Sequence, residues 1–446
     1  MKPAKYLIAL SLALASCQGF LDVELDREIL TAEAIVNRET AEAAAIGLYN
    51  SLQNFNLYGS DFVVLADLLG GNAIATGFQP RYQELADARV PTTNAFVESS
   101  WVRYYRIINS ANNILAHIDD IDGISPEARE RIRGTAHFFR ALSLFDLLRM
   151  YGEFADPNSA FGVPVFTVVL DRSTAPAVRR ASVADTYARI LDDLKRAEGE
   201  LPDSADRFFL SRAATRALLA RVYLYQKDYA NARAYAELVI GDGKYSLNAD
   251  YAANFRTEGS GESIFELNFT SIDGNGLARL LMLPAANEVS GSNEIWNAFP
   301  EGDARKGMFL RRFGVTRCIK YGELATDIET NVLLFRLAEM YLIQSEAIAN
   351  TLGPVAALEG LNAVRLRARP GMPIEASEVP DLAAYNELLL QERRLELAFE
   401  GHHWFDLVRL GKAVEARGIE PYRQILPIPE REIRVSDGVL AQNPGY

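Results

Sequence analysis

The sequence predicts a mostly α-helical fold of stacked helical hairpins, with an irregular, loop-rich insertion that contains short β segments. Apolar residues recur at helical spacing over the stretches of about 31–57, 96–152, 182–242 and 330–412. Between them, the stretches of about 58–95 and 243–329 break that spacing with Gly, Asn and Ser. Since 49% of its 446 residues are apolar, the chain is able to bury a large core.

The first helices are predicted at 37–57, 96–121 and 125–152. The third begins with Ser125 and Pro126, a favoured N-cap residue followed by a favoured first-turn residue. Trp101 lies on the amphipathic face of the second helix, and Trp404 lies on such a face near the C-terminus. We therefore expect both tryptophans to be core residues.

A repeat-like pattern occupies residues 214–240. Small and aromatic residues recur there with the spacing of a tetratricopeptide unit, in which two antiparallel helices meet through small residues: Ala220, Tyr223, Ala232 and Ala236. A second, imperfect copy spans 338–361, with a longer connection. The pattern predicts tetratricopeptide-like hairpins, with ordinary α-bundle packing as the alternative.

The irregular stretches carry weaker signals. A short β-rich segment is predicted at 162–169 and a strand at 263–270, while 62–89 is interpreted as loop with a short helix. Helical spacing resumes at Thr330–Asn331.

The formal net charge of −13 argues against a nucleic-acid partner, because nucleic-acid binding depends on cationic surface. It argues equally against adhesion to anionic lipid through a basic patch.

The N-terminus has the pattern of a secretion signal: two lysines, then an apolar run that is too short to span a bilayer. Leu14-Ala15-Ser16-Cys17 resembles the lipobox of bacterial lipoproteins. This predicts a signal peptide over 1–16, lipidation of Cys17 and a tether over 17–30, with a plain signal peptide as the alternative. Acidic residues at 22–26 resemble an export signal to the outer surface. With Cys17 lipidated, the remaining Cys318 has no partner for an intramolecular disulfide.

The stretch 391–412, QERRLELAFEGHHWFDLVRLGK, predicts a helix, a left-handed corner at Gly401 and a second helix. Three glutamates at i, i+4 and i+8 form a stripe of like charge that needs cations nearby: Glu392, Glu396 and Glu400. Arg393, Arg394 and Arg409 are the near candidates and Arg336 a more distant one. We expect a partly buried ionic network that joins two elements.

This stretch resembles the C-terminal signature of the SusD/RagB family of nutrient-binding outer-membrane lipoproteins. Residues 136–154 and 329–350 are similar to two further family helices, and 426–430 and 442–446 to its closing pattern. The resemblance implies one SusD-like lobe over 31–446 with loops shorter than is common in the family. It also implies nutrient capture at the cell surface and delivery to a SusC-like, TonB-dependent transporter, over which the protein acts as a lid.

An enzyme is the first alternative, because paired carboxylates serve retaining glycosidases. The arginines beside the glutamate stripe would keep it ionised, however, so we expect no catalysis. His402 and His403 are adjacent and lack the i, i+4 spacing of a helical metal pair. Calcium at Asp273–Asn275 stays open, although no EF-hand pattern is present. The sequence predicts no cofactor.

Exposed aromatic rings beside amide and charged groups are typical of sugar-binding sites. The aromatic candidates lie in the irregular stretches: Tyr58, Phe78, Tyr82 and Trp296. The polar candidates lie beside them: Asp67, Asn72, Gln79, Arg81 and Asn293. We expect 58–82 and 268–299 to come together on one face.

The favoured interpretation is therefore a surface-exposed, lipid-anchored binding protein for an oligosaccharide or similar nutrient. A surface glycan hydrolase and a tetratricopeptide-like interaction scaffold are the alternatives. Without the resemblance, composition and periodicity indicate only a secreted, mostly helical lipoprotein.

Overall fold

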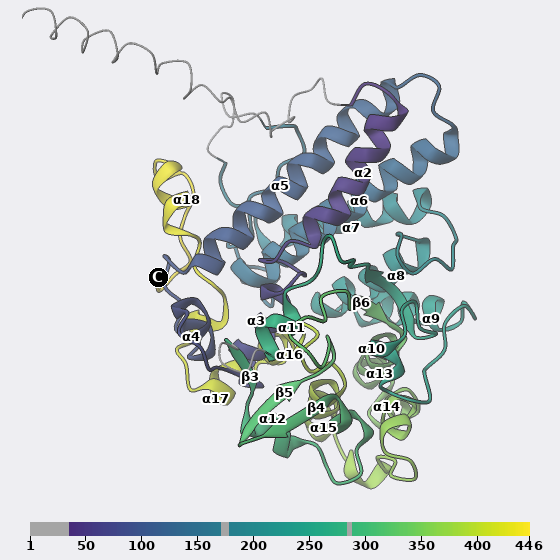
Figure 1. The fold of residues 1–446 in the computed structure, drawn as a ribbon, viewed down its shortest axis with the longest axis vertical. Helices are drawn as coiled ribbons and strands as arrows, with labels where there is room; N and C mark the ends of the chain where they lie inside the picture. The colour runs from purple at the N-terminus through teal and green to yellow at the C-terminus, as the bar shows by residue number, and fades with distance from the viewer. Residues whose placement is uncertain (1–34, 171–177, 283–287) are drawn as a thin grey trace, which may run out of the picture.

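The computed structural model describes residues 35–170, 178–282 and 288–446 (Figure 1). The predicted signal peptide, the predicted lipidation site Cys17 and the predicted tether lie outside these ranges. Within the described part of the chain, no helix is both long and apolar enough to cross a membrane.

Four helices form the N-terminal layer (Figure 1): α2 (Arg38–Leu52), α5 (Ala95–His117), α6 (Pro126–Tyr151) and α7 (Val183–Glu200). Asn37 caps α2, because its Oδ1 accepts the backbone N–H of Thr40 at 2.9 Å. Helix α6 is central to the layer and packs against α2, α5 and α7. Trp101 is buried against this layer, which confirms its place in the core.

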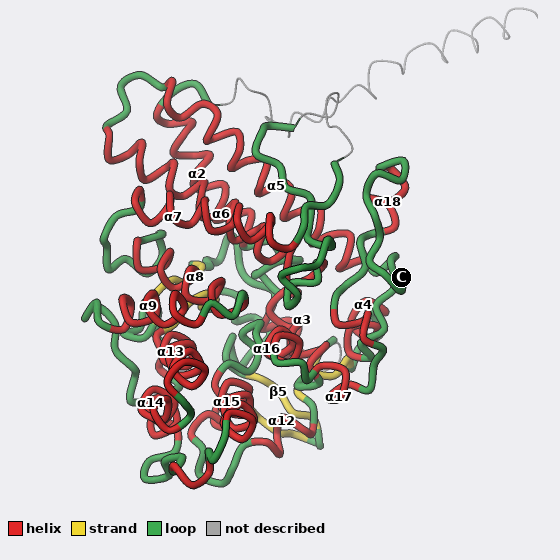
Figure 2. The backbone as a smooth tube through the Cα atoms, turned by 180° about the vertical axis from the view of Figure 1, so that it is seen from behind, coloured by secondary structure: helices red, strands yellow, loops and turns green. Residues whose placement is uncertain are grey.

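Further hairpins continue the stack: α8 (Arg212–Tyr225), α9 (Tyr229–Ile240), α13 (Leu337–Leu352) and α14 (Leu358–Ala368). Figure 2 shows α7, α8, α9, α13 and α14 following one another along one edge of the molecule, and neighbours in this order are in contact. Ala220, Ala232 and Ala236 are fully buried where α8 meets α9. Small residues let the two helices approach closely, so the tetratricopeptide-like hairpin is confirmed.

The insertion is built around two small antiparallel sheets. The first has the order β1-β3-β5-β4: β1 (Ala73–Ala75), β3 (Val289–Gly291), β5 (Val315–Cys318) and β4 (Phe309–Arg312). The second pairs β2 (Ser263–Leu267), which confirms the strand predicted there, with β6 (Val332–Arg336). Every residue of β2 and β6 is buried, which puts this pair inside the core.

Short helices occupy the rest of the insertion: α3 (Asp61–Gly70), α4 (Pro80–Ala86), α10 (Ala253–Arg256), α11 (Leu277–Met282) and α12 (Asn293–Ala298). Four helices complete the C-terminal part: α15 (Leu382–Glu396), α16 (His403–Arg409), α17 (Ala413–Arg417) and α18 (Glu430–Val435). Trp404 is buried on α16, as expected.

Three expectations about local structure are wrong. Residues 332–336 form strand β6 rather than the start of a helix, because a strand buried on both faces is apolar throughout and lacks alternation. Residues 62–89 contain two helices and a strand. Residues 162–169 form no strand, because side chains of α5 bind their carbonyls: Asn112 Nδ2 donates to the carbonyl of Val168 at 2.9 Å.

Candidate functional site

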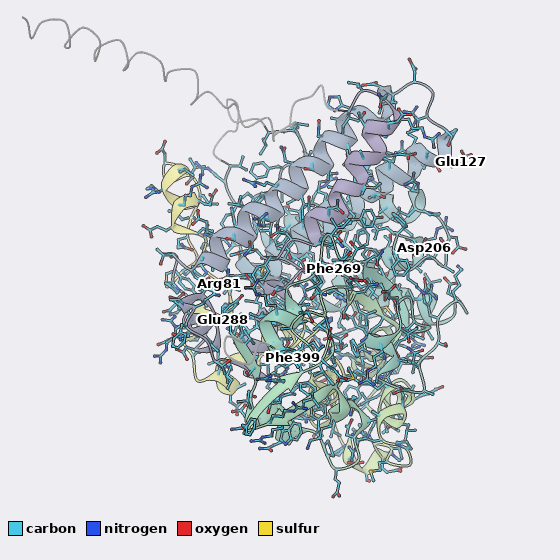
Figure 3. The ribbon with its side chains drawn as sticks, viewed as in Figure 1. Arg81, Glu127, Asp206, Phe269, Glu288 and Phe399 are labelled. Carbon is cyan, nitrogen blue, oxygen red and sulfur yellow. The ribbon has the colours of Figure 1, made fainter. Side chains whose placement is uncertain are left out.

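The two irregular segments meet through one antiparallel ladder. Ile74 on β1 lies opposite Ser290 on β3, and the backbone N–H of Thr76 donates to the carbonyl of Glu288 at 2.9 Å. The backbone N–H of Gln79 donates to the Glu288 carboxylate at 3.2 Å. Arg81 and Glu288 accordingly lie together on one side of the molecule in Figure 3. The expected meeting of the two segments is confirmed.

A groove of about 240 Å³ lies where they meet. We call it the Phe55 groove, and the residues that line it are Phe55, Gln79, Tyr82, Gly276, Arg279, Leu280 and Glu288. The Phe55 ring is 41% exposed, and Phe78, next to Gln79 in the chain, is 94% exposed. The groove thus combines open aromatic surface with an amide, a guanidinium and a carboxylate.

Two glycines allow this close approach. A Cβ at Gly276 would collide with the ring of Phe55, and a Cβ at Gly77 would collide with the carboxylate and Cα of Glu288. Any larger residue at either position would displace a side chain of the groove. These glycines break the helical spacing of the sequence, and they also allow the walls of the Phe55 groove to approach each other closely.

Arg81 supports the groove from one side. Its guanidinium carbon lies 5.5 Å from the ring centroid of Phe55 and 4.6 Å from that of Tyr82. Its Nη2 donates to the Tyr82 hydroxyl at 2.8 Å, and that hydroxyl donates to Asp61 Oδ1 at 2.6 Å. Burial raises the pKa of Asp61, which the Arg81 cation opposes. Arg81 therefore holds two aromatic rings and a carboxylate in fixed positions.

Four of the residues expected to contact ligand are buried in the core: Tyr58, Asp67, Asn72 and Tyr82. The hydroxyl of Tyr58 donates to Asp146 Oδ2 on α6 at 3.0 Å. Asp67 accepts from Asn72 Nδ2 at 2.9 Å. These polar groups are satisfied inside the protein, so their predicted exposure is wrong, and we withdraw Tyr58, Asp67 and Asn72 as ligand contacts. The ring of Tyr82 still forms part of the wall of the groove.

Asn293 and Trp296 lie on α12, beyond the other end of β3, and do not line the Phe55 groove. The half-buried indole of Trp296 has Lys306 Nζ 4.5 Å and Arg311 Cζ 5.6 Å from its ring. Asn293 accepts from Arg311 Nη2 at 2.8 Å. These residues form a separate surface patch, and their role as ligand contacts stays a prediction.

Sequence reasoning missed Phe55, Arg279 and Glu288. Phe55 lies in Asn54-Phe55-Asn56, an aromatic residue between two amides just after a helix, which was an available signal. Arg279 and Glu288 enter the groove only through the pairing of β1 with β3, which no local pattern reveals. Arg279 is exposed and forms no ion pair with any residue of the described ranges.

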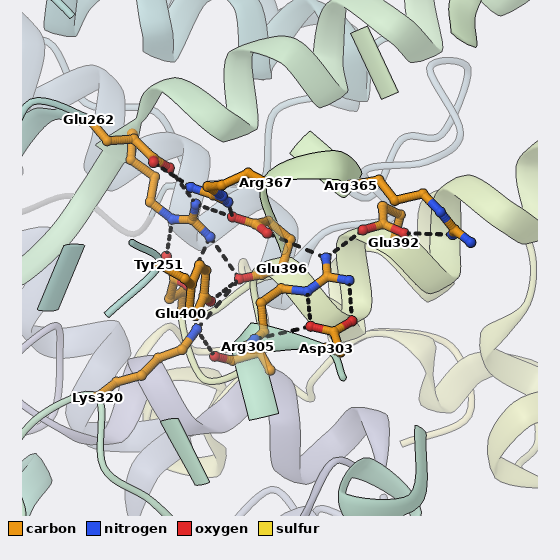
Figure 4. A network of polar contacts seen from close by, with 12 residues as sticks. Tyr251, Glu262, Asp303, Arg305, Lys320, Arg365, Arg367, Glu392, Glu396 and Glu400 are labelled. Atoms are coloured by element: carbon orange, nitrogen blue, oxygen red, sulfur yellow. Dashed lines mark hydrogen bonds and ion pairs between the residues drawn. The ribbon is translucent and has the colours of Figure 1, made fainter. Parts of the chain in front are cut away.

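Behind these surfaces, the three glutamates anchor a buried ionic network (Figure 4), although α15 ends at Glu396 and Glu400 lies in the corner that follows. Arg336 Nη1 donates to Glu396 Oε1 at 2.6 Å, and its Nε donates to Glu400 Oε2 at 2.7 Å. Lys320 Nζ donates to Glu400 Oε1 at 2.6 Å. The other members are Glu262, Asp303, Arg305, Arg365, Arg367 and Glu392. The expected network is real, and it joins α15 to β6, to α14 and to the segments before and after the β4–β5 hairpin.

The cations of this network are not the ones expected from proximity in sequence. Arg393 and Arg409 both bind Asp406, and Arg394 donates to Asn72 Oδ1 at 2.6 Å. Of the four candidate arginines, Arg336, the distant one, belongs to the network. The near arginines point away from the stripe toward α16 and α3.

Burial opposes ionisation of Glu396, but Arg367, Arg336 and Arg305 outweigh it and hold its pKa below the usual range. Burial likewise opposes ionisation of Glu400, and Arg336 with Lys320 lowers its pKa overall. A general acid needs the opposite shift, so the stripe is suited to structure rather than proton transfer.

The histidines after the stripe are also enclosed. Burial lowers the pKa of His403 to about 3 and, with Arg221, lowers that of His402 well below its ordinary value. Among the described residues, no group of three or more His, Cys, Asp or Glu side chains is placed to hold a metal ion.

Comparison with known proteins agrees with this fold. A sequence family described as starch-binding and associating with the outer membrane matches residues 19–224, and the SusD family matches residues 297–424. Two SusD-like proteins of Formosa agariphila are each 25% identical to this chain, and the alignments cover at least 97% of both partners. The chain belongs to the SusD/RagB family.

Solved SusD-type structures share the architecture. A SusD superfamily protein of Bacteroides vulgatus has a TM-score of 0.82 at 25% identity, covering 92% of this chain and 99% of that one. A laminarin-binding SusD-like protein has a TM-score of 0.77 at 26% identity, covering 92% of this chain and all of the other. The SusD/RagB signature predicted at 391–412 is therefore, in this chain, the α15–corner–α16 unit.

The corner of that unit has two left-handed residues. Phe399 has a φ of +60° and Gly401 a φ of +83°. The unusual conformation of Phe399 is held from both sides: its N–H donates to Asp67 Oδ2 at 3.0 Å, and its carbonyl accepts from the Tyr321 hydroxyl at 2.6 Å. The buried Asp67 thus ties the corner to α3, the helix whose N-terminus supports the groove.

Proposed function

We propose that this protein binds a glycan in the Phe55 groove at the bacterial cell surface. The observation that carries the proposal is the exposed ring of Phe55 beside the polar groups of Gln79, Arg279 and Glu288, with the exposed ring of Phe78 next to Gln79 in the chain. Pockets for small ligands are typically concave and apolar, with a few polar groups that fix the orientation of the ligand. The kinship with a laminarin-binding relative supports the same class of ligand.

Each group has a role in this proposal. A pyranose ring presents C–H groups on its faces, which stack on the exposed rings of Phe55 and Phe78. Gln79 and Arg279 donate hydrogen bonds to hydroxyl oxygens, and the Glu288 carboxylate accepts from hydroxyl groups. A stacking contact of this kind contributes about 1–3 kcal/mol, by analogy with base–aromatic stacking.

The proposal includes anchoring at the outer membrane through Cys17 and delivery of the glycan to a SusC-like, TonB-dependent transporter, for which the protein acts as a lid. The lipobox-like sequence at 14–17 and the outer-membrane association of the matching family support this part.

We propose binding without turnover. Glu396 and Glu400 are buried and paired with cations that lower the pKa of each carboxyl. Incubation of pure protein with a bound glycan should release no reducing ends.

Affinity electrophoresis and calorimetry with laminarin, starch, xylan, mannan and alginate test the proposed function. We expect at least one of these polysaccharides to bind, and Phe55→Leu to weaken that binding about tenfold by removing the flat ring. Failure of all five to bind would contradict the proposal.

A further inference from the structure

A second hollow, of about 770 Å³, opens beside the Phe55 groove. One wall is α10 with the loop that follows it, and the opposite wall is segment 319–331. Its volume falls within the roughly 300–1,000 Å³ of pockets that enclose a small ligand. We call it the Phe255 hollow.

Asn275 and Gly276 connect the linings of the two cavities. Asn275 Nδ2 donates to the carbonyl of Thr330 at 2.6 Å and to that of Ile328 at 3.2 Å, and both residues line the Phe255 hollow. The next residue, Gly276, lines the Phe55 groove. The chain neighbours Asn275 and Gly276 therefore connect the walls of the two cavities.

The Phe255 hollow contains the groups that a sugar needs. The Phe255 ring is half-buried, with Lys320 Nζ 4.6 Å from its centroid and Tyr251 packed edge-on, and it lines the hollow. Asn254 is only 2% exposed and also lines the hollow. Its Oδ1 accepts from Asn248, but its Nδ2 has no partner among the described residues. A buried donor without a partner is costly, and a ligand oxygen would satisfy it.

The charge of the hollow is unbalanced. Its lining includes five carboxylates and two cations: Glu258, Glu266, Glu323, Asp327 and Glu329 against Arg256 and Lys320. Lys320 is already bound to Glu400. Arg256 is paired with Glu323 at 3.2 Å in an exposed contact between the two walls, which contributes little to stability. Glu258 and Glu329 are exposed and form no ion pair with any described residue.

Carboxylates accept hydrogen bonds from hydroxyl groups and repel anionic groups. We propose that the Phe255 hollow is a second subsite, which takes further units of a neutral, hydroxyl-rich glycan chain whose other end occupies the Phe55 groove, and which rejects polyanionic glycans. This inference rests on the proposed function, because it assumes a glycan in the Phe55 groove.

The walls are held in place before any ligand arrives. Glu266 Oε1 on β2 accepts from the backbone N–H of Gly259 at 2.7 Å and from Asn331 Nδ2 at 2.9 Å, which ties both walls to the core. Lys320 joins segment 319–331 to the ionic network of α15. A subsite whose shape is already fixed loses less entropy on binding.

The test uses purified full-length protein and calorimetry with laminarin and starch oligosaccharides of increasing length, and with alginate as the polyanion. Phe255→Leu keeps apolar volume but removes the flat ring. The double variant Glu258→Lys/Glu329→Lys reverses two unpaired charges, and Glu130→Lys/Glu359→Lys makes the same charge change on exposed helix positions elsewhere.

We expect Phe255→Leu to weaken the binding of long neutral oligosaccharides about tenfold and to leave trisaccharide binding unchanged. The Glu258→Lys/Glu329→Lys variant should bind alginate about tenfold more tightly than wild type, and added salt should abolish the gain. The Glu130→Lys/Glu359→Lys control should show no such gain.

Two results together would refute the second subsite while the proposed function stands. The binding of long oligosaccharides would be lost in Phe55→Leu but unchanged in Phe255→Leu, and the Glu258→Lys/Glu329→Lys variant would bind alginate no more tightly than wild type. If wild-type protein binds none of these glycans, the proposed function and the subsite fail together.

Discussion

Replacing Glu396 by alanine should destabilise the protein more than any surface substitution on the same helix. Glu396 is fully buried, and one of its oxygens accepts from both Arg336 and Arg367. Its other oxygen lies 3.4 Å from Arg305 Nη1. Removing this carboxylate takes one acceptor from three guanidinium groups.

The magnitude follows from the charge balance of the network. Five cations face five carboxylates: Arg305, Lys320, Arg336, Arg365 and Arg367 against Glu262, Asp303, Glu392, Glu396 and Glu400. Losing Glu396 leaves the network with one buried positive charge that no carboxylate balances. Removing one partner of a buried ion pair costs about 3–5 kcal/mol, a large fraction of a total stability of about 5–15 kcal/mol.

The assay is urea unfolding followed by circular dichroism, with Glu387→Ala as the matched control. Glu387 is also a glutamate of α15 paired with a cation, Lys412, but its side chain is 58% exposed. An exposed pair contributes about 0–1 kcal/mol. Glu396→Gln keeps the side-chain volume, so it separates the loss of charge from the loss of packing. Equal unfolding midpoints for Glu396→Ala and Glu387→Ala would refute the buried network as a source of stability.

Three further predictions address other parts of the molecule. Folding lowers the pKa values of Glu396 and Glu400. Their contribution to stability is therefore complete above the unfolded-state pKa of about 4.3 and is lost as the pH falls from there through the folded-state pKa values. The urea midpoint should drop steeply below about pH 4 in wild type and less steeply in Glu396→Ala. Trp296→Ala should weaken glycan binding less than Phe55→Leu, because the indole lies outside the groove beside Lys306; an equal or larger loss in calorimetry would move the site to α12. Cys17→Ala should release the protein from washed membranes, and retention of that variant would exclude the lipid anchor.

The helical part of the fold was predictable because its signals are local. Ala220, Ala232 and Ala236 lie at the contact between α8 and α9, as their spacing indicates, and Ser125 caps α6. Strand β6 was missed because its apolar run is buried on both faces, so its periodicity did not distinguish a strand from a helix.

The site was harder to predict because it depends on contacts between distant residues. Tyr58 and Tyr82 lie in a stretch that the sequence predicts to be mostly loop, but their hydroxyls donate to the buried carboxylates of Asp146 and Asp61, and both rings are buried. The exposure of Phe78 was predictable because it follows Gly77 in a stretch that lacks helical spacing. The cations that pair with the three glutamates come from four other segments of the chain. The sequence therefore predicted that cations would be needed, but it did not identify which ones.

Phe78→Ala tests the central claim, glycan capture at the Phe55 groove, most directly. The side chain is 94% exposed, so its removal should leave the unfolding midpoint unchanged. Phe313→Ala is the matched control, since Phe313 is just as open on the turn between β4 and β5, away from the groove. With the polysaccharide that wild-type protein binds, we predict about tenfold weaker binding for Phe78→Ala and unchanged binding for Phe313→Ala. Unchanged affinity in Phe78→Ala, or an equal loss in both variants, would contradict the assignment of the groove as the glycan site.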